Sequence, residues 1–145
     1  MSDLANKLTL VSGSTKGIGK AVAEAFIDKK SRVIIHGRNR SDVEAVRASI
    51  GAFACVDGDL GTAEGCNSVI EQLTTLGPVD ILVNNVGIFG VENFFDIDDE
   101  EWLRYFQINI MSTVRLCRAI MPSMLEHDYG RIINISSEAA IKPLP

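Results

Sequence analysis

Three glycines near the N-terminus constrain the fold of this chain more than any other feature of its sequence. Gly13, Gly17 and Gly19 lie between an apolar run over residues 8–12 and a stretch over residues 17–30 whose apolar side chains recur with helical spacing. In a parallel α/β sheet, the turn from a strand to the following helix is where a ligand phosphate binds, because the first amide groups of the helix point at it. The sequence therefore predicts an α/β fold that binds a nucleotide.

The rest of the chain alternates between strand-like and helix-like segments. We expect strands over residues 8–12, 33–35, 53–56, 81–83 and 131–135, and helices over residues 17–30, 62–75 and 102–126 and from Ser41 onward. The expected strands are apolar throughout, which is typical of strands that are covered on both faces. Right-handed crossovers would build from them a Rossmann-like, doubly wound parallel sheet in three α/β/α layers, truncated after the fifth strand. We expect residues 1–145 to form a single dinucleotide-binding domain that is the N-terminal part of a longer single-domain protein.

Particular residues predict where two helices begin and where one bends. Ser41 is followed three residues later by Glu44, which is the pattern of a capping box. Asp98 precedes three acidic residues, and carboxylates suit the positive end of a helix dipole. Within the helix expected over residues 102–126, Pro122 predicts a bend.

Composition excludes several classes of protein. The net charge of −5 argues against a general nucleic-acid-binding protein, and no apolar run approaches the length of a membrane span. The three cysteines, Cys55, Cys66 and Cys117, form no CxxC pair and no histidine pair accompanies them, so we expect free thiols, no disulfide and no metal site. Residues 1–10 lack the layout of a signal peptide, and we expect a cytoplasmic protein.

The spacing of the three glycines is Gly-x-x-x-Gly-x-Gly, which differs from the Gly-x-Gly-x-x-Gly of the common dinucleotide fingerprint. The run from Ser12 to Gly19 resembles the T-G-x-x-x-G-I-G motif of the short-chain dehydrogenase/reductase family, with a serine in place of the threonine. The resemblance implies an enzyme that transfers hydride between a nicotinamide cofactor and a small carbonyl or alcohol substrate. The turn residues expected to bind the cofactor are Gly13, Ser14, Thr15, Lys16, Gly17, Ile18 and Gly19, with hydroxyl donors from Ser14 and Thr15.

The end of the second expected strand bears on which dinucleotide binds. NAD-binding sheets usually place a carboxylate there for the ribose 2′-hydroxyl, but this chain has His36 followed by a glycine and Arg38. The guanidinium of Arg38 could pair with a 2′-phosphate, and Lys16 could reach the same group. In the resembled family, basic residues at these two places accompany NADP, so we expect NADP rather than NAD. Alternatively, Arg38 and Arg40 are solvated loop charges, and we interpret His36 as a strand-end residue that binds no ligand.

The turn after the third expected strand offers two carboxylates. By resemblance, Asp59 meets the adenine amino group and Leu60 offers its backbone. Asp57 is the competing choice. We favour Asp59 because the family's aspartate is followed by an aliphatic residue.

A second turn motif follows the fourth expected strand. The run Asn84-Asn85-Val86-Gly87 is similar to the family's N-N-A-G, with valine in place of the small alanine. The resemblance implies that Asn85 and Gly87 lie along the cofactor ribose and that the motif stabilises the central sheet. Without the resemblance, the run is only a turn that ends a strand.

Two residues correspond to half of the family's catalytic set. By resemblance, Ser137 hydrogen-bonds the substrate carbonyl, although Ser136 beside it is the alternative, and Asn109 distorts its helix while its carbonyl holds a water. The family also uses a Tyr-x-x-x-Lys pair as its acid and base. Neither Tyr105 nor Tyr129 has a lysine four residues later, so we expect that pair beyond Pro145 and expect these 145 residues alone to be inactive.

Three functions are compatible with these features. The first is an NADP-dependent oxidoreductase, and the second is a dinucleotide-binding or regulatory module without catalysis. A third is a nucleotide-sugar or flavin-related reaction on the same sheet. The stretch over residues 102–124 also carries more apolar side chains than one sheet face requires, and the resemblance implies that it packs across a dimer axis of a homodimer or homotetramer.

Overall fold

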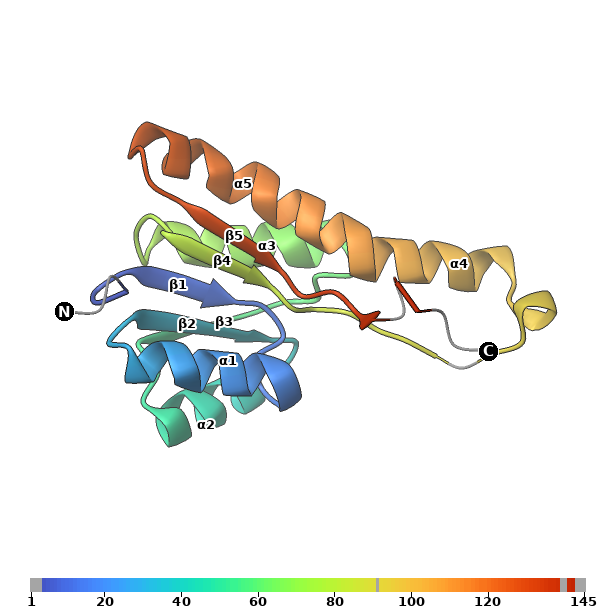
Figure 1. Cartoon of the computed structure of the whole chain (residues 1–145), viewed down its shortest axis with the longest axis horizontal. Helices are drawn as coiled ribbons and strands as arrows, with labels where there is room; N and C mark the ends of the chain where they lie inside the picture. The colour runs from blue at the N-terminus through green and yellow to red at the C-terminus, as the bar shows by residue number, and fades with distance from the viewer. Residues whose placement is uncertain (1–3, 91, 139–140, 143–145) are drawn as a thin grey trace.

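A computed structural model describes residues 4–90, 92–138 and 141–142 of the chain (Figure 1). Five parallel strands form one sheet in the order β3-β2-β1-β4-β5. The strands are β1 (Leu8–Val11), β2 (Arg32–Gly37), β3 (Ala54–Asp57), β4 (Ile81–Asn84) and β5 (Arg131–Asn134). The chain leaves β1 first toward one edge of the sheet and later toward the other, as the doubly wound prediction requires.

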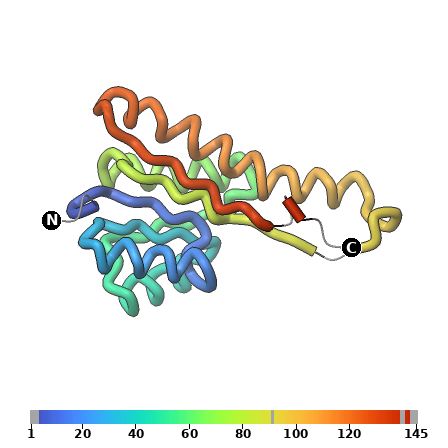
Figure 2. The backbone as a smooth tube through the Cα atoms, in the orientation of Figure 1, coloured from blue at the N-terminus to red at the C-terminus, as the bar shows by residue number. Residues whose placement is uncertain are grey.

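Helices cover both faces of the sheet and complete three layers (Figure 1). The helical elements are α1 (Gly17–Asp28), α2 (Arg40–Ile50), α3 (Ala63–Thr74), η1 (Phe94–Asp96), α4 (Asp99–Phe106), the π-helical η2 (Gln107–Met111) and α5 (Ser112–Glu126). Helices α1 and α2 lie on one face, and α3 and α5 lie on the other. The tube in Figure 2 follows α4, η2 and α5 as one long helical run.

Two apolar cores account for the continuous hydrophobic runs in the strands. Leu10 faces the core beneath α3 and α5, and its neighbour Val11 faces the core beneath α1 and α2. Successive side chains of a strand point to opposite faces, so both faces must be apolar when both are covered. The expectation from the apolar strands is therefore confirmed.

The expected start of the second helix is wrong by one residue. Helix α2 begins at Arg40 after Asn39, and no side-chain hydrogen bond caps it. Glu44 does not close a capping box with Ser41, because its carboxylate accepts a 2.7 Å bond from Nε of Arg40. Arg40 and Glu44 lie one helical turn apart, and their ion pair stabilises a helix that begins at Arg40.

The helix expected over residues 102–126 is interrupted, but not at the proline. Asp98 caps α4 as predicted, because its Oδ1 accepts from the backbone nitrogen of Glu101 at 2.8 Å. Pro122 lies within α5, which continues to Glu126. The change in helical geometry falls instead at η2, a π-helical segment centred on Asn109. The family's helix distortion at this asparagine is therefore present.

The structure describes all three cysteines, and it also bears on metal and membrane sites within the described residues. The three cysteines are free thiols. Among the described residues, no cluster of histidine, cysteine and carboxylate side chains could hold a metal ion, and no helix combines the length and apolar character needed to cross a membrane.

Candidate functional site

The candidate site lies at the edge of the sheet where all five strands end. Because the strands are parallel, their carboxyl ends meet there, and every candidate residue after a strand is carried to this edge. The glycine turn after β1 lies at its centre. Gly13 and Gly17 adopt positive φ angles of 62° and 56°, which favour glycine, and a Cβ on Gly19 would collide with Gly13 O and Asn85 Nδ2.

The N-terminus of α1 is open toward solvent. The residue before the helix is Lys16, whose side chain makes no capping hydrogen bond, and the first turn contains no acidic residue. Lys16, Gly17 and Ile18 are exposed, and a Cβ at Gly17 would meet nothing within 4 Å. The first amide groups of α1 are therefore accessible to an anion, as the turn motif predicts.

Ser14 does not fulfil the expectation that its hydroxyl donates to a phosphate. Its side chain is buried, donates to Val11 O at 2.7 Å and accepts from the backbone nitrogen of His36 at 2.9 Å. Its own backbone nitrogen donates to His36 O at 2.9 Å. The serine has no further proton to offer, and it joins the glycine turn to β2 instead.

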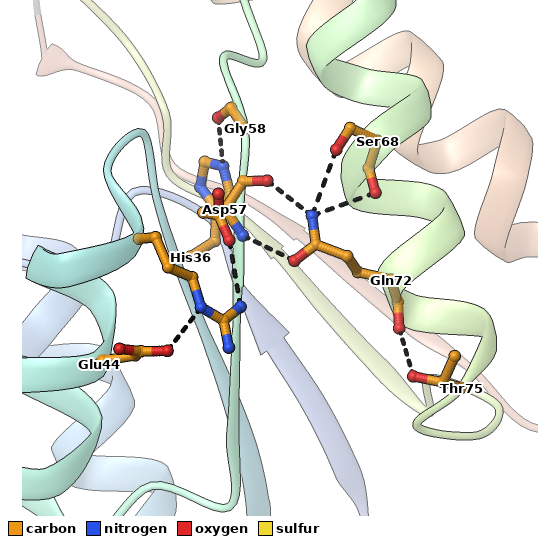
Figure 3. Close-up of polar contacts among 8 residues, drawn as sticks. His36, Glu44, Asp57, Gly58, Ser68, Gln72 and Thr75 are labelled. Carbon is orange, nitrogen blue, oxygen red and sulfur yellow. Dashed lines mark hydrogen bonds and ion pairs between the residues drawn. The ribbon is translucent and has the colours of Figure 1, made fainter.

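His36 is a structural residue of the site, near the end of β2 as expected, and it also holds the glycine turn in place. It is 2% exposed, and its ring bonds on both sides. Nδ1 accepts from Gly13 N at 3.0 Å. Nε2 donates to Gly58 O at 3.0 Å, the bond drawn in Figure 3. Burial lowers the pKa of the ring below its ordinary value of 6.5, against weaker opposing effects of Gly58, Asp57 and Asp59. A polar residue inside an apolar strand, next to a glycine, was the only signal in the sequence.

Ser12 and Asn85 hold the glycine turn to the end of β4. The Ser12 hydroxyl accepts from the backbone nitrogens of Asn85 and Val86 at 2.9 and 3.1 Å. The Asn85 amide donates in return to the carbonyl oxygens of Ser12 and Gly13 at 3.0 and 3.1 Å. The hydroxyl that serine shares with the family's threonine is thus in use, and this contact explains why Asn85 lies beside the turn.

The basic residues after β2 have different environments. Arg40 pairs with Glu44 and also with Asp57, whose Oδ1 lies 3.1 Å from the guanidinium. Arg38 is exposed and has no ion-pair partner among residues 4–90, 92–138 and 141–142, and the same is true of Lys16. Arg38 follows Gly37, where a Cβ would lie 2.6 Å from the Thr15 side chain, so it begins beside the glycine turn.

The two carboxylates after β3 also differ. Asp57 ends the strand, its carboxylate is paired with Arg40, and the Gln72 side chain bonds its backbone nitrogen and oxygen (Figure 3). Asp59 is exposed, and its Oδ1 accepts from Gly61 N at 2.9 Å. Leu60 is 2% exposed, so it can offer only its backbone to a ligand.

The π-helical segment directs Asn109 toward the chain after β4. The Asn109 Oδ1 accepts from Ile88 N at 2.8 Å, and Nδ2 donates to Ile88 O at 3.0 Å. A Cβ at Gly87 would lie 3.4 Å from the same amide oxygen. The side chain of Asn109 therefore clamps the segment that follows Gly87.

The candidate serines follow β5 at the same edge. The backbone nitrogen of Ile135 extends the ladder to Asn84 O at 2.9 Å, and Ser136 and Ser137 come next in exposed positions. Asn84 and Asn134 are register partners whose side chains bond at 2.9 Å. The structure thus joins the glycine turn directly to Asn85 and His36. Separately, it joins Asn109 to Ile88, the residue after Gly87.

Strand order and glycine turn define a Rossmann-type α/β domain. The family model described as short chain dehydrogenase matches residues 7–145, and the chain belongs to that family. Among curated proteins, it is 44% identical over 145 residues to the uncharacterized oxidoreductase YvrD of Bacillus subtilis, covering 98% of this chain and 55% of that protein. It is 37% identical over 138 residues to the 3-oxoacyl-(acyl-carrier-protein) reductase FabG of Haemophilus influenzae, covering 90% and 55%.

Solved structures show the same fold. L-sorbose reductase from Gluconobacter frateurii, complexed with NADPH and L-sorbose, superimposes with a TM-score of 0.90 at 31% identity, over 99% of this chain and 57% of that one. A 3-oxoacyl-(acyl-carrier-protein) reductase from Agrobacterium tumefaciens with NADP bound gives 0.89 at 30% identity, over 97% and 56%. The chain therefore spans little more than half the length of these relatives.

Proposed function

We propose that the protein containing this chain is an NADP-dependent oxidoreductase that transfers hydride between the nicotinamide and a small carbonyl or alcohol substrate. Residues 1–145 would form its dinucleotide-binding domain. The observation that carries the proposal is the open N-terminus of α1 beneath the glycine turn, with Lys16 and Arg38 exposed beside it. Similar proteins bind such a cofactor, since the sorbose reductase structure contains NADPH and the Agrobacterium reductase contains NADP.

Different residues at the carboxyl ends of the strands would bind different parts of the cofactor. The turn from Gly13 to Gly19 would bind the pyrophosphate through backbone amides. Lys16 and Arg38 would pair with the 2′-phosphate, because no carboxylate at the end of β2 is placed to select the 2′-hydroxyl of NAD. Asp59 is the better adenine partner, since Arg40 already neutralises Asp57. Leu60 would contribute backbone, and Asn85 and Gly87 would lie along the ribose.

The chain would contribute binding, orientation and one hydrogen-bond donor to the reaction. The bound cofactor supplies or accepts the hydride at nicotinamide C4. The Ser137 hydroxyl would donate to the substrate carbonyl oxygen and stabilise the negative charge that develops there. Asn109 would hold a water on its main-chain carbonyl, because its amide is occupied by Ile88. The proton for the carbonyl oxygen would come from a group outside these residues, so the isolated chain would be inactive.

A direct comparison of cofactors tests the proposal. The full-length protein is titrated with NADP+ and NAD+, and NADPH oxidation is followed across a panel of aldehydes and ketones. We expect tighter binding of NADP+ and turnover of at least one carbonyl substrate. Equal affinity for the two dinucleotides would overturn the roles of Lys16 and Arg38, and binding without any turnover would overturn the enzymatic assignment.

The open N-terminus of α1 at the glycine turn is equally compatible with a second candidate function, a dinucleotide-binding module without catalysis. Such a module would use the same glycine turn and the same phosphate contacts. The carbonyl panel separates the two functions, because a module binds NADP+ but turns over no substrate.

We also propose that the protein is a cytoplasmic homodimer or homotetramer. Trp102, Phe106 and Ile110 are exposed along the α4–α5 run, each four residues after the last, and Val114 continues the row. Large apolar patches of this kind mark protein interfaces. Size-exclusion chromatography with light scattering should give a multiple of the protomer mass, and a monomer in dilute solution would contradict the assignment.

A further inference from the structure

The His36 ring joins two segments of the candidate cofactor site that are far apart in the sequence. One segment is the glycine turn, whose Gly13 nitrogen donates to Nδ1. The other is the loop after β3, whose Gly58 oxygen accepts from Nε2, as Figure 3 shows. The same residue bonds the turn through its backbone, since its nitrogen donates to the Ser14 hydroxyl and its oxygen accepts from Ser14 N. Histidine is therefore the link between the pyrophosphate turn and the adenine side of the edge.

The partners of the ring determine its protonation state. A backbone nitrogen can only donate, so Nδ1 must carry a lone pair toward Gly13. A carbonyl oxygen can only accept, so Nε2 must carry the proton toward Gly58. Both bonds exist only in the neutral ring with its proton on Nε2. A second proton on Nδ1 would point at the Gly13 N–H and break that bond.

The surroundings favour the neutral ring at neutral pH. Burial lowers its pKa, while the nearby Asp57 and Asp59 on β3 and its following loop oppose that effect. Asp57 is paired with Arg40 on α2, which weakens its pull on a ring proton. On the glycine turn, the charged residue is Lys16, which is exposed.

We infer that His36 is a positioning residue for the dinucleotide, and that its protonation in mild acid releases the glycine turn and weakens cofactor binding. This inference rests on the proposed function, because it assumes that the turn binds the cofactor. The released Gly13 nitrogen would no longer be fixed, and the amides that face the pyrophosphate would lose their common orientation.

Two substitutions separate the two bonds of the ring. In His36→Asn, the amide oxygen lies where Nδ1 lies and can accept from Gly13, but it does not titrate. In His36→Gln, the amide nitrogen can reach Gly58 O, but nothing accepts from Gly13. The variants are matched in polarity and charge, so they differ mainly in which segment stays bonded.

The full-length wild-type protein and both variants are titrated with NADP+ between about pH 8 and about pH 4.5, because burial lowers the pKa of the ring and its protonation falls toward the acid end of this range. The 2′-phosphate of the ligand titrates equally in all three. In wild type, we expect affinity to fall more steeply at the acid end of this range than in His36→Asn, by up to about tenfold once the ring is protonated, which corresponds to the loss of one hydrogen bond. His36→Gln should bind weakly at every pH.

The outcomes distinguish this inference from the function on which it rests. If wild type fails to bind NADP+ at about pH 8, where the ring is neutral, the proposed function is wrong and the inference falls with it. If wild type binds but shares the pH profile of His36→Asn, only the inference is overturned. A ¹⁵N spectrum of wild type, which does not depend on the folding of a variant, should show the proton on Nε2, and a proton on Nδ1 would contradict the inference.

Discussion

Nη1 of Arg40 lies 3.1 Å from Oδ1 of Asp57, so this ion pair connects the first residue of α2 to the last residue of β3. Arg38, two residues earlier, has no ion-pair partner among residues 4–90, 92–138 and 141–142. Two arginines that lie two residues apart thus have different tasks. Arg40 is a structural cation, and Arg38 remains available to a ligand. Substituting each arginine in turn therefore tests whether Arg38, and not Arg40, binds the cofactor.

Replacing Arg38 with alanine is expected to weaken NADP+ binding by about 10- to 100-fold, because a hydrogen bond to a charged group is worth about 1.5–3 kcal/mol. Binding of NAD+, which lacks the 2′-phosphate, should not change. Isothermal titration with both ligands measures the effect. The control is Arg40→Ala, which should alter NADP+ affinity by no more than about fivefold, since exposed ion pairs contribute about 0–1 kcal/mol. A larger loss in the control than in Arg38→Ala would contradict the assignment.

Asn109→Ala is expected to lower the free energy of unfolding by about 1–3 kcal/mol, because it leaves the Ile88 nitrogen and oxygen without their side-chain partner. Urea denaturation with an unchanged slope measures this loss. Asn109→Asp is the comparison, since it keeps an acceptor for Ile88 N but lacks the donor. It should be less stable than wild type because a carboxylate faces Ile88 O. Wild-type stability of the alanine variant would contradict the clamp.

Ser137→Ala is expected to lower kcat by about 100- to 1000-fold in the full-length enzyme, the usual effect of removing a donor to a developing oxyanion. Cofactor affinity should stay the same, because the role concerns the substrate carbonyl. Ser136→Ala provides the neighbouring control and should retain most of the activity. If the loss follows Ser136 instead, the donor is one residue earlier than proposed.

The buried His36 ring makes stability depend on pH in a definite direction. Its pKa is lower in the folded protein than in the unfolded chain, so as the pH falls the unfolded chain takes up this proton first. The contribution of the neutral His36 ring to the free energy of unfolding is therefore fully present above pH 6.5, the ordinary pKa of a histidine. It is lost as the pH falls below that value toward the lower pKa of the folded protein. Urea midpoints at several pH values should decline less steeply in His36→Asn than in wild type. Parallel declines would show that the ring does not carry the effect.

Much of the fold could be predicted because its determinants are local or periodic. The apolar runs of β1, β2 and β4 and the helical spacing after Gly17 specify alternating elements, and the handedness of crossovers then orders the sheet. The cap at Asp98 could be predicted for the same reason, since its partner is only three residues away.

The contacts that hold the candidate site together could not be predicted in this way. Ser12 meets Asn85 and Val86 more than seventy positions later, and His36 meets Gly13 and Gly58 from another strand. No spacing rule connects such residues. Ser14 is an example. The sequence places its hydroxyl in a phosphate-binding turn, but the structure shows that the hydroxyl is buried and donates to Val11 O.

The bonds of Ser12 and Asn85 have a consequence for how fast and how tightly a dinucleotide can bind. They fix the loop before any ligand arrives, so little conformational entropy remains to be lost on association. Binding should then occur at a preorganised site, with little rearrangement of the loop when the ligand arrives. A substitution at Ser12 would lower affinity without touching the ligand, by making the competent loop a minority state.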